Sequence, residues 1–113
     1  APRPRSAAPA SPLIAPLKLG DAQLAHRIAV SPMTRLRMEP GTDLPRDLNG
    51  LYYEQRSSQG GLVITECFAI SADSGGYVRA PTMSTDAQAA AWLPVVKRVH
   101  DAGGVFYAQL FHA

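Results

Sequence analysis

One stretch of the sequence restricts the possible folds more than any other. Residues 62–70, LVITECFAI, form a nearly continuous apolar run rich in β-branched side chains. Such a run suits a strand that is buried on both faces, as in parallel sheets covered by helices. A second strand-like run, residues 105–110, follows a segment with helical spacing. The order strand, helix, strand predicts parallel βαβ units and therefore an α/β fold.

Shorter elements are expected before this run. A hairpin should turn at Gly20 and Asp21, and an apolar strand should span residues 28–31. Asp47 is a candidate cap for a helix that Gly60 and Gly61 would end. Its inward positions are predicted from helical spacing to be Leu48, Leu51, Tyr52 and Gln55.

The helix between the two long strands has clearer limits. Thr85 and Gln88 have the spacing of a capping box, and the helix is expected to run to about Asp101. Its inward residues should be Trp92, Val95, Val96 and Val99. Pro94 lies in the expected interior, where it would cost about 3 kcal/mol unless the helix kinks or starts late.

Two architectures fit this order of elements: an open doubly wound sheet, or the beginning of a (β/α)8 barrel. The first strand is followed by Ser31-Pro32-Met33-Thr34, which is not the GxGxxG phosphate turn of a dinucleotide-binding fold. This absence counts against a Rossmann half.

Composition narrows the range of partners. The net charge is only +2 and no Lys/Arg cluster is present, so no nucleic-acid partner is expected. Cys67 is the single cysteine, which excludes an internal disulfide and makes a metal cluster unexpected. No stretch approaches the roughly 20 apolar residues of a membrane span.

Residues 1–12 are interpreted as a flexible Pro/Ala-rich tail of a cytoplasmic protein. Because no acidic residue precedes Asp21, an organelle transit peptide is the alternative.

Polar side chains lie at the end of each predicted strand. The first strand leads to Thr34, the second carries Thr65, Glu66 and Cys67, and the third carries Gln109 and leads to His112. Parallel strands place their carboxyl ends at one edge, where such folds bind ligands. Gln109 can both donate and accept hydrogen bonds, which matches the imide edge of a planar heterocycle. Glu66 is expected to be a buried carboxylate satisfied by backbone donors or by Arg56.

At these residues the sequence resembles the amino-terminal part of the Old Yellow Enzyme family of NAD(P)H:flavin oxidoreductases and ene-reductases. The resemblance covers residues 13–113 and rests on five segments in a fixed order: PLKLG at 16–20, HRIAVSPMTR at 26–35, LYYEQRSSQGGLVITE at 51–66, SGGYVRAP at 74–81 and AAWLPVVKRVHDAGGVFYAQLFH at 90–112. It implies an FMN-binding (β/α)8 TIM barrel. Only the amino-terminal hairpin and the first three strands with two helices would be present.

The resemblance also implies site roles. Thr34 would hydrogen-bond a flavin carbonyl, and the backbone of Pro32 and Met33 would lie along the ring. Cys67 stands where the family usually has Ala or Gly, with its amide facing the flavin. Gln109 would bind the pyrimidine edge. Tyr77 and Phe111 would line the substrate pocket.

The function implied is reduction of activated, enone-like C=C bonds with FMN as cofactor and NADH or NADPH as hydride donor. The catalytic residues of the family would lie downstream, so residues 13–113 are expected to be an amino-terminal fragment, inactive alone. Three hypotheses follow: a piece of an ene-reductase that can form oligomers, a non-catalytic remnant, or a small self-contained α/β ligand-binding module.

Overall fold

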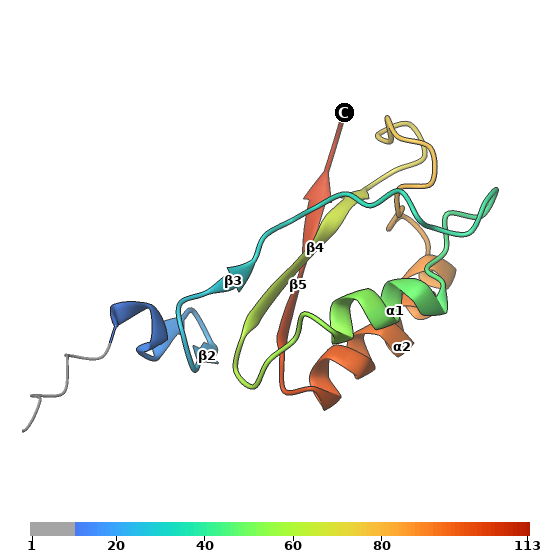
Figure 1. The fold of residues 1–113 in the computed structure, drawn as a ribbon. Helices are drawn as coiled ribbons and strands as arrows, with labels where there is room; N and C mark the ends of the chain where they lie inside the picture. Colours follow the sequence, from blue (N-terminus) through green and yellow to red (C-terminus); the bar gives the residue numbers. More distant parts are fainter. Residues whose placement is uncertain (1–10) are drawn as a thin grey trace, which may run out of the picture.

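The computed structural model describes residues 11–113 and shows a parallel sheet with two helices on one of its faces (Figure 1). The expected flexible tail falls almost entirely on residues 1–10, which lie outside the described residues. The elements in chain order are η1 (Pro12–Ile14), β1 (Leu17–Leu19), β2 (Ala22–Leu24), β3 (Ala29–Val30), α1 (Asp47–Glu54), β4 (Leu62–Ala69), α2 (Asp86–Asp101) and β5 (Val105–Phe111).

The strands form two sheets. β1 and β2 pair antiparallel around Gly20, whose φ of +58° is a backbone conformation that glycine adopts readily. The other three strands are parallel in the order β3-β4-β5, so β4 is central, as its apolar sequence predicts. β3 has two residues where four were expected. The hairpin and the parallel βαβ units predicted from the sequence are confirmed.

Helix α2 confirms the predicted capping box. The Thr85 hydroxyl accepts from the Gln88 amide at 3.2 Å, and the Gln88 side chain accepts from the Thr85 amide at 3.1 Å. Trp92, Val95 and Val99 are buried as expected, whereas Val96 is only half-buried. The helix does not start late: Pro94 lies inside it, on the exposed side.

Helix α1 corrects two expectations. It starts after Arg46, with Asp47 as its first residue rather than its cap, and it ends at Glu54, well before Gly60. Its inward face was also predicted wrongly. Leu48 and Leu51 are roughly half exposed, and the buried residues are Asn49, Gly50 and Tyr53. A Cβ added at Gly50 would lie 3.0 Å from Cδ of Arg98, so the close approach of α2 decides which face turns inward.

The core lies between the sheet and these two helices. Phe68 of β4 meets Trp92 of α2 with ring centroids 4.6 Å apart. Tyr53 of α1 lies 5.1 Å from the ring of Phe106 on β5. One buried cluster contains Met38, Tyr53, Val63, Phe68, Trp92, Val95 and Val99, and the partly buried Phe106 packs against it. Burial of these rings is therefore what holds both helices on one face of the sheet.

We predict that Pro94→Ala stabilises the protein. Pro94 has no N–H for the helical hydrogen bond and is exposed, so replacement adds a backbone bond without removing buried contacts. The free energy of unfolding, measured by urea denaturation, should rise by up to about 3 kcal/mol.

The neighbouring Leu93→Ala is the control, because Leu93 is also in α2 and is 64% exposed. It should change the free energy of unfolding by no more than about 0.5 kcal/mol. An unchanged or lower value for Pro94→Ala would show that the helix is not continuous there.

Candidate functional site

An open cavity of about 470 Å³ lies at the carboxyl ends of the three parallel strands. Its lining comes from every strand of the sheet or from the loop that follows it. The residues are Thr34 and Leu36 after β3, Cys67 on β4, Tyr77 after β4, and Gln109 and Phe111 on β5. Five of these six were expected from the sequence to form a site. The structure brings those five together.

A β-bulge in β4 determines which side chains face this cavity. Ile64 pairs with Tyr107, but the next pair is Cys67 with Gln109, so β4 contains one extra residue. Val63 and Phe68 both belong to the core beneath the helices although they are an odd number of positions apart. Regular alternation would place them on opposite faces. The bulge therefore reverses the alternation and turns Cys67 toward the cavity and Glu66 toward the helices.

Thr65 satisfies the polar groups at the bulge. Its hydroxyl accepts from the Gln109 amide at 3.1 Å and donates to the Glu66 carbonyl at 2.8 Å. The Gln109 amide therefore stays hydrogen-bonded where the ladder is interrupted. Within residues 11–113 the side chain of Gln109 has no hydrogen-bond partner, so it is available to a ligand.

Thr34 and Cys67 touch at the base of the cavity. Thr34 Oγ1 and Cys67 Sγ lie 3.1 Å apart, in a hydrogen bond that either can donate. Cys67 is buried. Sulfur is a weak hydrogen-bonding partner, so the Thr34 hydroxyl can exchange this contact for one to a stronger acceptor.

Two aromatic residues form another wall. The rings of Tyr77 and Phe111 are 6.1 Å apart with an angle of 33° between their planes. The loop that carries Tyr77 is tied to the end of β5 by the Ala113 amide, which donates to the Ser74 carbonyl at 3.0 Å. Tyr77 is 56% exposed, so its ring is available for contact from the open side.

Three other predicted positions are not part of the lining. Pro32 and Met33 precede Thr34 on the same extended segment, half-buried and exposed respectively. Their backbone role beside a ring stays a prediction. His112, the polar residue after the third strand, is exposed, with Nδ1 2.7 Å from the Ala113 carbonyl oxygen. Leu36 was missed, because a loop leucine between two arginines gives no sequence signal.

Glu66 lies directly beneath the cavity on the helix side of β4, and it is fully buried. Its Oε2 accepts from the Arg35 amide at 3.1 Å and its Oε1 from the Tyr53 hydroxyl at 3.2 Å. Tyr53 in turn accepts from the Glu66 amide at 2.9 Å. Backbone donation to Glu66 is confirmed, but Arg56 is not its partner. Arg56 lies over the ring of Tyr52, 3.8 Å from the centroid.

Burial dominates the electrostatics of this pair. It raises the pKa of Glu66 above the ordinary value of 4.5, while the Arg35 and Leu36 amides and the Tyr53 hydroxyl partly offset the effect. Burial also raises the pKa of Tyr53, and the Glu66 charge adds to this. Tyr53 is therefore a neutral donor, and the hydrogen bonds to Glu66 only partly offset the cost of burying its charged form.

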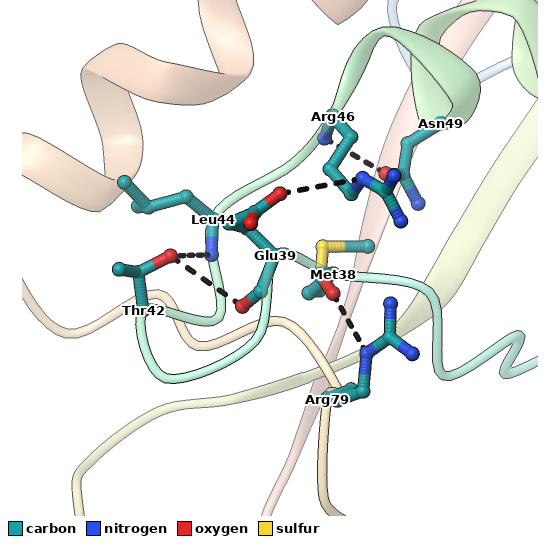
Figure 2. Close-up of polar contacts among 7 residues, drawn as sticks. All are labelled: Met38, Glu39, Thr42, Leu44, Arg46, Asn49 and Arg79. Carbon is teal, nitrogen blue, oxygen red and sulfur yellow. Dashed lines mark hydrogen bonds and ion pairs between the residues drawn. The ribbon is translucent and has the colours of Figure 1, made fainter.

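The two loops at the rim are joined to each other (Figure 2). Arg79, in the loop after β4, donates from Nε to the Met38 carbonyl at 2.9 Å, and the Met38 amide donates to the Arg79 carbonyl at 3.2 Å. Met38 is completely buried. Nearby, Arg46 and Glu39 form an ion pair at 3.3 Å. The loop that carries Thr34 and Leu36 therefore cannot move independently of the loop that carries Tyr77.

Other kinds of site find no support in residues 11–113. No group of three or more His, Cys, Asp or Glu side chains there is arranged to hold a metal ion. In the same residues, neither helix has the length and apolar character needed to cross a bilayer.

Comparison with known proteins gives a consistent set of relatives. The model of the NADH:flavin oxidoreductase / NADH oxidase family matches residues 12–113. Flavin oxidoreductase hxnT of Emericella nidulans is 41% identical over 110 residues, covering 95% of this chain and 28% of that protein. 12-Oxophytodienoate reductase 1 of Oryza sativa subsp. japonica is 39% identical over 112 residues, covering 99% of this chain and 29% of that protein.

A solved structure agrees with the fold. The old yellow enzyme homologue from Zymomonas mobilis superposes with a TM-score of 0.84 at 40% identity, over 90% of this chain and 28% of that one. The chain thus spans less than a third of the length of these relatives. The predicted fold class is confirmed: the hairpin, three strands and two helices correspond to part of a TIM barrel of the Old Yellow Enzyme type.

We predict a pH-dependent stability difference between the protein and Glu66→Gln. Glu66 keeps its proton to higher pH when folded than when unfolded, so between those two pKa values the folded state binds more protons. Its contribution to the free energy of unfolding is therefore present at low pH and is lost as the pH rises through the raised pKa. The loss should be about 1.4 kcal/mol per unit of pKa shift.

Urea denaturation of both proteins between about pH 4 and 7 tests this linkage. Glu66→Gln should gain stability relative to the unmodified protein as the pH rises. Tyr53 stays neutral across this range. The lowered pKa of Asp73 acts in the opposite direction but equally in both proteins, so it cancels. A difference independent of pH would contradict the assignment.

Proposed function

Because the chain belongs to the NADH:flavin oxidoreductase / NADH oxidase family, we propose that its cavity forms part of an FMN site in an enzyme that reduces activated C=C bonds. The family is the one predicted from the sequence, and the matches confirm it. That the whole protein is a flavin-dependent oxidoreductase, as the sequence also predicts, belongs to the proposal. The activated, enone-like alkene and the reduced nicotinamide, NADH or NADPH, belong to the proposal.

The observation that carries the proposal is the convergence of five predicted residues on one cavity. Thr34, Cys67, Tyr77, Gln109 and Phe111 come from two strands and two loops, yet they line the same open space. A chain that only packed against a partner would have no reason to gather hydrogen-bonding and aromatic side chains there. This combination is typical of sites that hold a planar, polar-edged ring.

The residues present fit FMN. A flavin ring needs apolar contacts on its faces and neutral hydrogen-bonding groups at its edge, and it needs no metal ligand. Thr34 and Gln109 are neutral, and Gln109 can match both a ring N–H and a ring carbonyl. Leu36, Tyr77 and Phe111 provide the apolar surface. No charged side chain lines the cavity, which suits an uncharged ring.

We assign the roles as follows. Thr34 donates to a ring carbonyl, Gln109 binds the pyrimidine edge, and the amide of Cys67 faces the ring. The backbone of Pro32 and Met33 lies along it, and Tyr77 and Phe111 border the alkene. When bound, FMN supplies hydride chemistry, taking a hydride from the nicotinamide and giving it to the β-carbon of the alkene. Preorganised donors such as Thr34 favour the state in which negative charge develops on the carbonyl they face.

We further propose that residues 1–113 alone do not turn over substrate. The parallel sheet has three strands, and β5 leaves Tyr107 and Leu110 exposed by 45% and 65%. A barrel of this class takes about 250 residues. The cavity has walls only on the side that these strands provide.

Titration of the full chain with FMN tests the site. Flavin fluorescence should be quenched saturably, and Gln109→Leu and Thr34→Val should each raise the Kd by about five- to tenfold, as expected for a lost hydrogen bond. Gln23→Leu, the same change at the exposed residue of strand β2, is the matched control and should leave the Kd unchanged. Equal affinity in all four proteins would refute the assignment of Gln109 and Thr34.

The activity is tested by a graft. Residues 13–113 replace the corresponding segment of the Zymomonas mobilis homologue, to which this chain is 40% identical. The hybrid should bind FMN and oxidise reduced nicotinamide with an enone, and Gln109→Leu should weaken both. A folded hybrid that binds FMN but reduces no enone would contradict the proposed substrate class.

A further inference from the structure

Glu66 is the one fully buried acidic side chain among residues 11–113, and it is not part of the cavity. No described cation lies within ion-pair distance of it. Its carboxylate is held by the Arg35 amide and the Tyr53 hydroxyl, and the Leu36 amide also favours the charged form. A buried carboxylate opposes folding unless such donors compensate it.

The backbone that Glu66 holds is the part of the loop that borders the cavity. Thr34 and Leu36 both line the cavity, and the Arg35 amide bound by Glu66 lies between them. Leu36 has a φ of +55°, which is unfavourable for a residue with a side chain. Such conformations persist only when the surroundings fix them. The Glu66 carboxylate supplies that restraint from the opposite side of the sheet.

The bulge in β4 makes this possible. Glu66 and Cys67 are adjacent, yet Glu66 reaches Tyr53 on the helix side and Cys67 reaches Thr34 on the cavity side. Thr34 is thus fixed at two points: its hydroxyl contacts Cys67, and the amide of the next residue binds Glu66. Of these two contacts, the one to Glu66 is the stronger, because its acceptor is a carboxyl oxygen, whereas sulfur is a weak hydrogen-bonding partner.

We infer that Glu66 is a positioning residue, which fixes the backbone at Arg35 and Leu36 and thereby aims the Thr34 hydroxyl into the cavity. The ligand toward which the hydroxyl points rests on the proposed function; the fixing of the loop does not. A residue that serves stability alone would, when replaced, loosen β4, α1 and the loop together. Replacing a positioning residue would instead alter the loop and the properties of the bound flavin more than it loosens β4 and α1.

Three variants separate these roles. Glu66→Met keeps the side-chain volume but has no oxygen acceptor, and Glu66→Gln keeps one acceptor and should rescue. Tyr53→Phe is the matched control, because it removes a donor to the same carboxylate from the helix side and leaves the Arg35 contact in place. None of these residues lines the cavity.

The first measurement is amide hydrogen exchange of the full chain without FMN. In Glu66→Met, exchange at Arg35 and Leu36 should accelerate by about tenfold relative to the amides of β4, as expected for the loss of a buried hydrogen bond. Glu66→Gln and Tyr53→Phe should keep most of this protection. Uniform acceleration along β4, α1 and the loop, or none at Arg35, would overturn the inference.

The second measurement is the midpoint potential of bound FMN. Loss of an aligned Thr34 donor should make it more negative, so Glu66→Met should resemble Thr34→Val. The double variant should be no more negative than Thr34→Val alone, because both changes remove the same interaction. Additive shifts would overturn the inference. If the unmodified chain binds no FMN, the proposed function fails for this chain, and the exchange data alone decide the role of Glu66.

Discussion

The β-bulge at Thr65 and Glu66 is the constraint on which the rest of the structure depends. Strand β4 is buried on both faces, so each side chain must suit either the helix side or the cavity side. Without the extra residue, Glu66 would face the cavity and Cys67 the aromatic core. The Thr65 hydroxyl stabilises the bulge by binding the Gln109 amide and the Glu66 carbonyl. The Thr65 side chain thus compensates for the interrupted hydrogen bonds of the ladder. The bulge itself places the Glu66 carboxyl group on the face opposite the cavity.

Helix α1 links this strand to the core through one residue. Tyr53 packs its ring against Trp92 and Phe106 and presents its hydroxyl to Glu66. The apolar part of the ring contributes to the hydrophobic core, and the hydroxyl satisfies a polar group that burial would otherwise penalise. The same residue therefore connects helix packing to the loop that carries Thr34.

Much of the architecture followed from the sequence, because it depends on local patterns. The apolar run of β4, the capping box at Thr85 and the turn at Gly20 gave the element order correctly, and the polar strand ends located the cavity. The bulge was not predictable, since residues 62–70 are a nearly continuous apolar run without the regular alternation that a bulge would interrupt. The inward face of α1 was missed because α2 approaches at Gly50, a tertiary contact that helical spacing cannot reveal.

The cavity is preorganised by strained backbone in both of its loops. Leu36 and Arg79 have φ values of +55° and +63°, and each such residue typically costs about 1–3 kcal/mol. Hydrogen bonds hold both segments: Glu66 binds the amide beside Leu36, and Met38 exchanges two hydrogen bonds with Arg79. The free-energy cost of these strained conformations therefore falls on folding rather than on ligand binding. The two loops then lose little conformational entropy when a ligand binds, so this side of the cavity can contribute to affinity although it offers few polar contacts.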